Sequence, residues 1–247
     1  EFRRVLFDLT HFFEMIRNAL YEYNNEYDIV PSLGIYLVQD RSLSIEAMYN
    51  RATLAAKQCK GSYVNCFAYY SEFMSVSIAR EQEIINEMNN ALEKHQFVVY
   101  LQPKIDLTNG KSCGAEALTR WNHPRRQIDP HEFIEIFERN GFITKLDYYI
   151  WEQVCAMLRR WIDDGYHPYP ISVNISRVDL YNPKLVDMIL DLVHKYEIVP
   201  ELLNLELTES AYNDNPVMLT ETIERLQRHG FTIMMDDFGS GDRKSVV

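Results

Sequence analysis

The 247-residue sequence lacks most of the features that mark membrane, secreted or nucleic-acid-binding proteins. It has no signal-peptide pattern and no run of about 20 apolar residues, the length that a membrane helix needs. Positive charge is scarce: 25 Lys and Arg residues against 36 Asp and Glu residues give a net charge of −11. This balance argues against non-specific binding to DNA or to an anionic membrane.

Metal-ligand spacings of cysteine and histidine are also missing. The four cysteines, Cys59, Cys66, Cys113 and Cys155, form no CxxC pair, which is typical of buried or idle thiols in a reducing cytoplasm. The seven histidines are scattered. Hydrophobic residues make up 47% of the chain, enough for the core of one large domain or two small ones. We therefore expect a cytoplasmic globular protein.

The first 80 residues predict a small α/β segment. "FRRVLF" (2–7) and "PSLGIYLV" (31–38) are interpreted as strands, and "HFFEMIRNALYEY" (11–23) and "SIEAMYNRATLAAKQ" (44–58) as helices. No carboxylates cluster here. We place the domain boundary near residues 75–80, before the next helix.

From Glu81 onward, helical and strand patterns alternate. Helices are predicted over 80–96, 146–165, 183–196 and 216–230, and strands over 97–105, 112–121, 171–176, 203–210 and 231–237, with a turn at Asn109-Gly110. This rhythm predicts a parallel sheet, either open or closed into a barrel. In both architectures the functional site lies at the carboxyl ends of the strands.

Polar residues lie late in two of these strands, within a third, and at the end of the last, all toward one rim. They are Glu116, Asn174, Glu206, and the adjacent pair Asp236 and Asp237. Taken singly, each is more typical of a turn, a helix cap or a solvated carboxylate. Together they predict an oxygen-rich site for hard divalent cations, Mg²⁺ or Mn²⁺. Two such ions can share an aspartate pair and cleave a phosphodiester, and Arg120 is placed to grip a phosphate.

These motifs resemble the EAL-domain family. "EALTRW" (116–121), preceded by "YLQPKIDLTNGKSCGA", is similar to the family signature, and "VNIS", "LELTES" and "DDFGSG" follow in the family order. The resemblance covers about two thirds of the chain. It implies a modified (βα)8 TIM-like barrel and metal-dependent hydrolysis of cyclic di-GMP to linear pGpG.

The resemblance also implies the role of each site residue. The residues that match metal ligands are Glu116, Asn174, Glu206, Asp236 and Asp237, of which Asp237 also contacts the attacking water. Gln102 and Arg120 match substrate contacts, and Glu209 matches the residue that braces the loop after the aspartate pair. Glu116, Asp236 and Asp237 are the expected catalytic residues, and a homodimer through the EAL domain is the expected assembly.

Residues 1–78 resemble, more weakly, the C-terminal half of a GGDEF domain. Glu1-Phe2 matches the end of that signature, and Thr53 and Lys57 depart from the usual Asp and Tyr, which predicts a degenerate, regulatory module. The EAL barrel is then expected over 79–241 and truncated after about the fifth strand. The final residues, 242–247, depart from the family's Tyr-Ser-Ser-Leu and are interpreted as a non-native tail.

Because the sequence opens with Glu1 and stops before the family's later lysine, glutamate and glutamine, we expect a fragment truncated at both ends. The fragment alone is expected to be inactive and poorly soluble, and a sensor or a membrane anchor upstream stays open for its parent. Two alternatives stay open for the parent. One is a non-catalytic cyclic di-GMP receptor, and the other is an unrelated metal-dependent hydrolase on a similar barrel.

Overall fold

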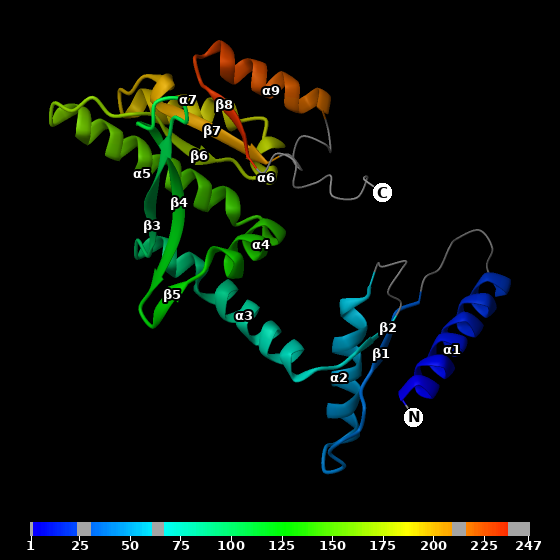
Figure 1. Cartoon of the computed structure of the whole chain (residues 1–247). Helices are drawn as coiled ribbons and strands as arrows, with labels where there is room; N and C mark the ends of the chain where they lie inside the picture. Colours follow the sequence, from blue (N-terminus) through cyan, green and yellow to red (C-terminus); the bar gives the residue numbers. More distant parts are fainter. Residues whose placement is uncertain (1, 24–30, 61–66, 209–215, 237–247) are drawn as a thin grey trace. The chain divides into compact units, whose positions relative to one another are not determined.

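The computed structural model describes residues 2–23, 31–60, 67–208 and 216–236. The chain divides into two compact units, Glu1–Gln82 and Glu83–Val247. The division falls inside one helix, α3 (Glu72–Glu93) (Figure 1). The helix predicted over 80–96 is confirmed and buries Ile84, but it begins at Glu72, earlier than the sequence pattern indicates.

Apart from the first turns of α3, the described residues of the first unit form two short parallel strands and two helices. These elements are α1 (Phe2–Tyr23), β1 (Leu33–Ile35), α2 (Ile45–Gln58) and β2 (Phe67–Tyr69). The strand predicted over 2–7 is wrong, because this segment forms the first turns of α1. Phe2, Val5 and Leu6 are spaced three and four residues apart, a helical period, and no Gly or Pro follows to separate them from the helix predicted at 11–23.

The second unit is built on a curved sheet whose strand order is β3-β4-β6-β7-β8, with β5 paired to β4. The strands are β3 (Phe97–Ile105), β4 (Ser112–His123), β5 (Arg126–Ile128), β6 (Ile171–Asn174), β7 (Leu203–Thr208) and β8 (Ile233–Asp236). β4, β6, β7 and β8 are mutually parallel, which confirms the predicted parallel sheet. β3 and β4 instead form a long antiparallel hairpin around the predicted turn at Asn109-Gly110 (Figure 1).

The helices of the second unit follow the strands. They are α4 (Pro130–Asn140), α5 (Ile143–Asp163), α6 (Arg177–Leu180), α7 (Leu185–Lys195) and α9 (Pro216–Arg228), with a 3-10 turn at Pro200–Leu202. α4 was not predicted, although Asp129 and Glu132 form a capping box at its start. In the described part of the chain no helix combines the length and the apolar character needed to cross a membrane.

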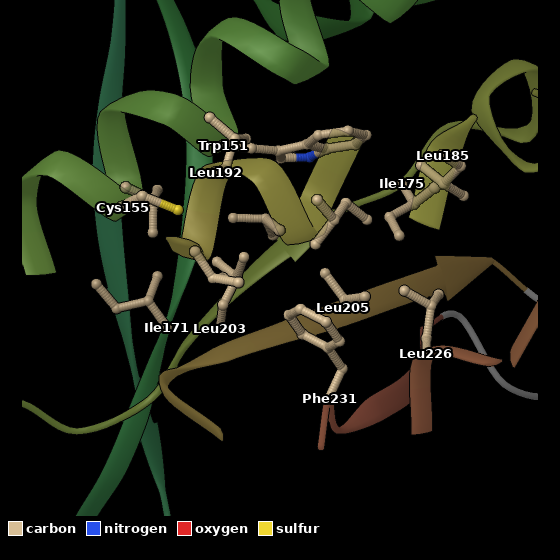
Figure 2. Close-up of a cluster of buried hydrophobic side chains, with 14 of the residues drawn as sticks. Trp151, Cys155, Ile171, Ile175, Leu185, Leu192, Leu203, Leu205, Leu226 and Phe231 are labelled. Carbon is tan, nitrogen blue, oxygen red and sulfur yellow. The ribbon is translucent and has the colours of Figure 1, made fainter. Parts of the chain in front are cut away.

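Alternate residues of the parallel strands form the core. Apolar side chains of β6 and β7 point toward α5, α7 and α9, as Figure 2 shows for Ile171, Leu203 and Leu205 packed near Trp151, Leu192 and Leu226. A second cluster joins β3, β4, α3, α4 and α5 through aromatic rings, among them Phe97, Trp121, Phe133 and Phe137. One face of the sheet packs against these two clusters. Successive residues of a strand point to opposite faces, so the residues that alternate with the core residues lie on the other face.

Candidate metal and phosphate site

The strand register brings the predicted site residues onto that opposite face. Gln102 lies directly opposite Glu116 in the β3–β4 pair, and Asn174 lies opposite Glu206 in the β6–β7 pair. Ser172, two residues before Asn174, is the register partner of Glu116. Since residues two apart on a strand share a face, Gln102, Glu116, Asn174 and Glu206 all lie on one side of the sheet.

Glu116 and Asn174 contact each other. Nδ2 of Asn174 donates a hydrogen bond to Oε1 of Glu116 at 3.2 Å. The backbone at Asn174 is fixed from behind, because Nε1 of Trp151 donates to its carbonyl oxygen at 3.0 Å. The neighbouring Ile175 N donates to the carbonyl oxygen of Glu206 at 2.9 Å, which ties this strand end to the next one. The structure therefore holds these three site residues on adjacent, mutually bonded strands.

Glu206 is buried, with 5% of its surface exposed, and it is paired with a lysine. Lys104 of β3 forms an ion pair with Oε1 of Glu206, and its Nζ lies 3.7 Å from Sδ of Met234 on β8. A side chain of the first strand therefore reaches the last strand of the curved sheet. Lys104 was not among the predicted site residues. The available signal was its place two residues after Gln102, which puts both side chains on the same face.

Arg120 lies further along β4, four residues beyond Glu116 and on the same face of the strand. Its guanidinium stands 5.7 Å from the ring centre of Tyr100, and Nη1 donates to the carbonyl oxygen of Thr119 at 2.9 Å. A cavity of about 240 Å³ opens here and is lined by Arg120, Asn174 and apolar residues that include Leu118. Gln102 is exposed. The Arg120 cation and the amide of Asn174 thus border one cavity.

The remaining predicted residues are described less fully. Asp236 ends β8, and its backbone pairs with Thr208. Asp237 and Glu209 lie outside the described residues. Among the side chains that the structure describes, no three His, Cys, Asp or Glu groups gather into a ready metal cluster. A complete ligand set would need Asp236 and Asp237.

The donor atoms that are described suit a hard divalent cation. They are carboxylate and amide oxygens on one face of the sheet, the ligand type that Mg²⁺ and Mn²⁺ take. In addition, Oδ1 of Asn204 is buried on the same face and has no hydrogen-bond partner among the described residues. An oxygen-rich face with an orphaned acceptor fits a cation site.

Two aspartates, the fully buried Asp179 and the partly buried Asp147, support the segment that carries Asn174. Oδ2 of Asp147 accepts from Ser176 N at 3.2 Å, and Ser176 Oγ donates to Asp179 Oδ2 at 2.6 Å. Burial, and then the hydrogen bond and negative charge of Asp179, raise the pKa of the Asp147 carboxyl well above its ordinary value. The Asp147 carboxyl therefore favours its protonated form beside the site, which was not predicted from the sequence.

Of the described cysteines, Cys59 and Cys155 are buried and Cys113 is exposed, and all three are free thiols. Burial, followed by the charge of Glu152, raises the pKa of the Cys155 thiol to about 12. A thiol of this kind is not a nucleophile at neutral pH, which agrees with the interpretation of Cys155 as idle. Cys66 lies outside the described residues.

The chain is similar to several bacterial signalling proteins. It is 30% identical over 219 residues to the bifunctional diguanylate cyclase/cyclic di-GMP phosphodiesterase MucR of Pseudomonas aeruginosa, a match covering 88% of this chain and 32% of MucR. It is 30% identical to the cyclic di-GMP phosphodiesterase NbdA of the same organism, a match covering 86% of this chain and 27% of NbdA. The signaling protein YkoW of Bacillus subtilis is 32% identical, and the match covers 85% of this chain and 26% of YkoW. The chain thus spans about a third or less of the length of these relatives.

Solved structures share the fold. The structure of the P. aeruginosa MucR phosphodiesterase in complex with c-di-GMP superposes with a TM-score of 0.61 at 32% identity and covers 64% of each chain. The S helix-GGDEF-EAL structure of Vibrio cholerae LapD has a TM-score of 0.58 at 16% identity and covers 86% of this chain and 51% of LapD, a likeness in fold alone. The expected barrel-type α/β fold is confirmed.

A family model also matches the chain directly. The EAL domain model matches residues 85–244, which include the strands and helices of the second unit and every predicted site residue. The family expected from the "EALTRW" signature is therefore confirmed on more than half of the sequence. This protein belongs to the EAL domain family.

Proposed function

We propose that this EAL domain, in its full-length protein, hydrolyses cyclic di-GMP to linear pGpG. The observation that carries the proposal is the joint placement of Glu116, Asn174 and Glu206 on one face of adjacent strands, with Gln102 and Arg120 on the same face. This is an arrangement of oxygen ligands beside a phosphate-binding cation. The identity to MucR and NbdA supports the choice of substrate.

Each residue has a distinct proposed role. Glu116, Asn174, Glu206, Asp236 and Asp237 would hold Mg²⁺ or Mn²⁺, and Glu209 would brace the loop after the aspartate pair. When bound, the two ions lower the pKa of a water and stabilise the oxygen that leaves phosphorus. Arg120 orients the phosphate through paired hydrogen bonds, and Gln102 contacts the substrate. One water is consumed and one phosphodiester bond breaks, so the ring opens with a 5′-phosphate at one end.

The test is turnover by the purified full-length protein. Cyclic di-GMP is incubated with Mg²⁺ or Mn²⁺, and pGpG is quantified by chromatography. Glu116→Gln should abolish product formation, since the amide keeps the shape but loses the charge that holds a cation. Glu93→Gln, an exposed position at the end of α3, is the matched control and should retain activity.

A second candidate is a receptor that binds cyclic di-GMP without cleaving it. The observation in its favour is the ion pair between Lys104 and Glu206, because a carboxylate that already has a cation needs a metal less. Tight binding of cyclic di-GMP without pGpG formation in either metal would reject the phosphodiesterase and support the receptor.

We also propose the setting in which the domain works. Residues 1–78 form the C-terminal half of a degenerate, regulatory GGDEF-like module, and the EAL domains pair as a homodimer in the cytoplasm. The parallel β1–β2 pair packed on α2 and the alignment with MucR over 88% of the chain support the first part. Sedimentation of the full-length protein at several concentrations tests the dimer.

A further inference from the structure

The side chain of Lys104 is more restricted by its contacts than that of an ordinary surface lysine. It is 28% exposed, and the carboxylate it contacts is 5% exposed, so Glu206 depends on a nearby cation to offset its desolvation. Its stem crosses the sheet from β3 toward β7 and β8. The residue directly opposite Lys104 in the hairpin is Gly114, which presents no side chain in its path.

Gly114 has no room for a side chain of its own. A Cβ atom at this position would lie 2.8 Å from the carbonyl oxygen of Pro170, closer than real contacts allow. Even alanine would therefore displace the backbone before β6. The far end of the lysine is held as well, since Nζ lies 3.7 Å from Sδ of Met234. The hairpin and the final strand together direct the ammonium group to Glu206.

The ammonium and a divalent cation cannot use Glu206 in the same way at the same time. Mg²⁺ binds carboxylate oxygens at about 2.0–2.1 Å, and an ammonium on the same carboxylate would be a like charge at close range. A second acceptor for the lysine lies nearby: Asn204, two residues before Glu206 and on the same face, has an orphaned Oδ1, and its Nδ2 lies 3.8 Å from the same Met234 sulfur.

We propose that Lys104 is a built-in competitor of the metal, an ammonium that neutralises Glu206 and withdraws toward Asn204 when a divalent cation binds. Lys104 thereby sets the metal affinity of the site. This inference rests on the proposed function, because it takes Glu206 as a metal ligand. It adds that a residue outside the ligand set determines how tightly the cation is held.

The experiment measures Mn²⁺ affinity directly, by the electron paramagnetic resonance signal of free Mn²⁺ in solutions of the full-length protein. Lys104→Met should tighten Mn²⁺ binding by about tenfold, since it removes one charge-assisted hydrogen bond that the metal must break. Lys111→Met makes the same charge change at an exposed residue of the same hairpin and should leave the affinity unchanged. If Lys104→Met does not fold, Lys104→Gln takes its place with the same expected increase.

A second readout does not involve metal affinity. In buffer with a chelator, Lys104→Met should melt at a lower temperature than the unaltered protein. Added Mn²⁺ should remove this difference in melting temperature, because either cation can neutralise Glu206. Lys111→Met should show neither effect.

The outcomes separate this inference from the proposed function. If Glu206→Gln weakens Mn²⁺ binding but Lys104→Met leaves it unchanged or weaker, Lys104 is not a competitor, and the proposed ligand set stands. If Glu206→Gln leaves Mn²⁺ affinity unaltered, Glu206 is not a ligand, and the proposed site fails together with the inference.

Discussion

Asn174 donates its amide hydrogen to Glu116 across the junction of β6 and β4, at 3.2 Å. The two residues are 58 positions apart in the sequence, yet the parallel pairing of their strands places them on one face. The contact orients one carboxylate oxygen of Glu116 toward Asn174. A hydrogen bond of this kind fixes the direction in which a ligand presents its lone pairs.

We predict that Asn174→Ala reduces turnover by roughly 10–100-fold, as expected when a group that binds or orients a metal ligand is removed. Because Asn174 is exposed, the free energy of unfolding should change by less than about 1 kcal/mol. Steady-state kinetics and urea unfolding measure the two effects. Asn90→Ala, an exposed asparagine of α3, is the control. Equal losses of activity and stability would mean that Asn174 has only a structural role.

The acid pair of Asp147 and Asp179 predicts an unusual pH dependence of stability. The pKa of Asp147 is raised in the folded state above its ordinary value of 3.8, so the folded protein keeps a proton that the unfolded chain releases. Stability should therefore be greatest in acid and fall as the pH rises from about 3.8 toward the folded pKa, with a contribution of at most about 1.4 kcal/mol per pH unit. Urea unfolding at a series of pH values measures the slope.

Asp147→Asn should remove this contribution. The amide keeps an oxygen for the backbone of Ser176 and can donate to Asp179, as the protonated acid does. The variant should be more stable than the unaltered protein at neutral pH and equally stable in acid. Asp191→Asn, at an exposed position of α7, should leave the pH profile unaltered. A destabilised Asp147→Asn at pH 7 would show that the charged form of Asp147 is the native one.

Local pattern was sufficient to predict the elements that carry the site. Each strand of the parallel sheet combines apolar residues on one face with polar residues at its carboxyl end, as in Leu203, Leu205 and Glu206, so both strand and site could be identified from a few adjacent residues. The rule for parallel sheets predicts these residues at the strand ends, but of Glu116, Asn174 and Glu206 only Asn174 ends its strand, and Glu116 lies well inside β4.

Long-range relationships could not be predicted in this way. Lys104 and Glu206 are 102 residues apart and meet only because the sheet curves, and Asp147 and Asp179 meet only because α5 packs beside α6. α4 was overlooked because its amphipathic stretch is only 11 residues long and directly follows a strand and turn. The start of α1 was wrong because a six-residue apolar segment fits a strand and a helix equally well.

Gly34 predicts a steric limit in the first unit. An added Cβ atom would lie 1.7 Å from the carbonyl oxygen of Ala52 and 2.5 Å from the nitrogen of Ala56, so β1 packs directly against the backbone of α2. Gly34→Ala should destabilise this unit by about 3 kcal/mol or more, because the backbone rather than a side chain must move. Hydrogen exchange of the β1 and α2 amides measures the effect.

The control for that prediction is Gly165→Ala, which has open space around its Cβ but a positive φ of 83°. This substitution should lower the free energy of unfolding by only about 1–2 kcal/mol, the strain of a left-handed backbone conformation. Normal amide protection of β1 and α2 in Gly34→Ala would mean that the strand and the helix can move apart without a loss of stability, which would contradict the prediction.

Trp121, the last residue of the "EALTRW" signature, is predicted to act through packing and not through the substrate. It is fully buried on the face opposite the site, its ring stands 4.9 Å from that of Phe97, and its Nε1 donates to Oε1 of Gln96 at 3.1 Å. Trp121→Phe loses that hydrogen bond and leaves a small cavity, so the free energy of unfolding should fall by about 1–3 kcal/mol. Urea unfolding measures the loss, and turnover per folded molecule should stay unchanged. If Trp121 acts only through packing, activity should fall in proportion to the amount of folded protein. A larger fall in turnover than in the folded fraction would mean that the indole also contributes to the functional site.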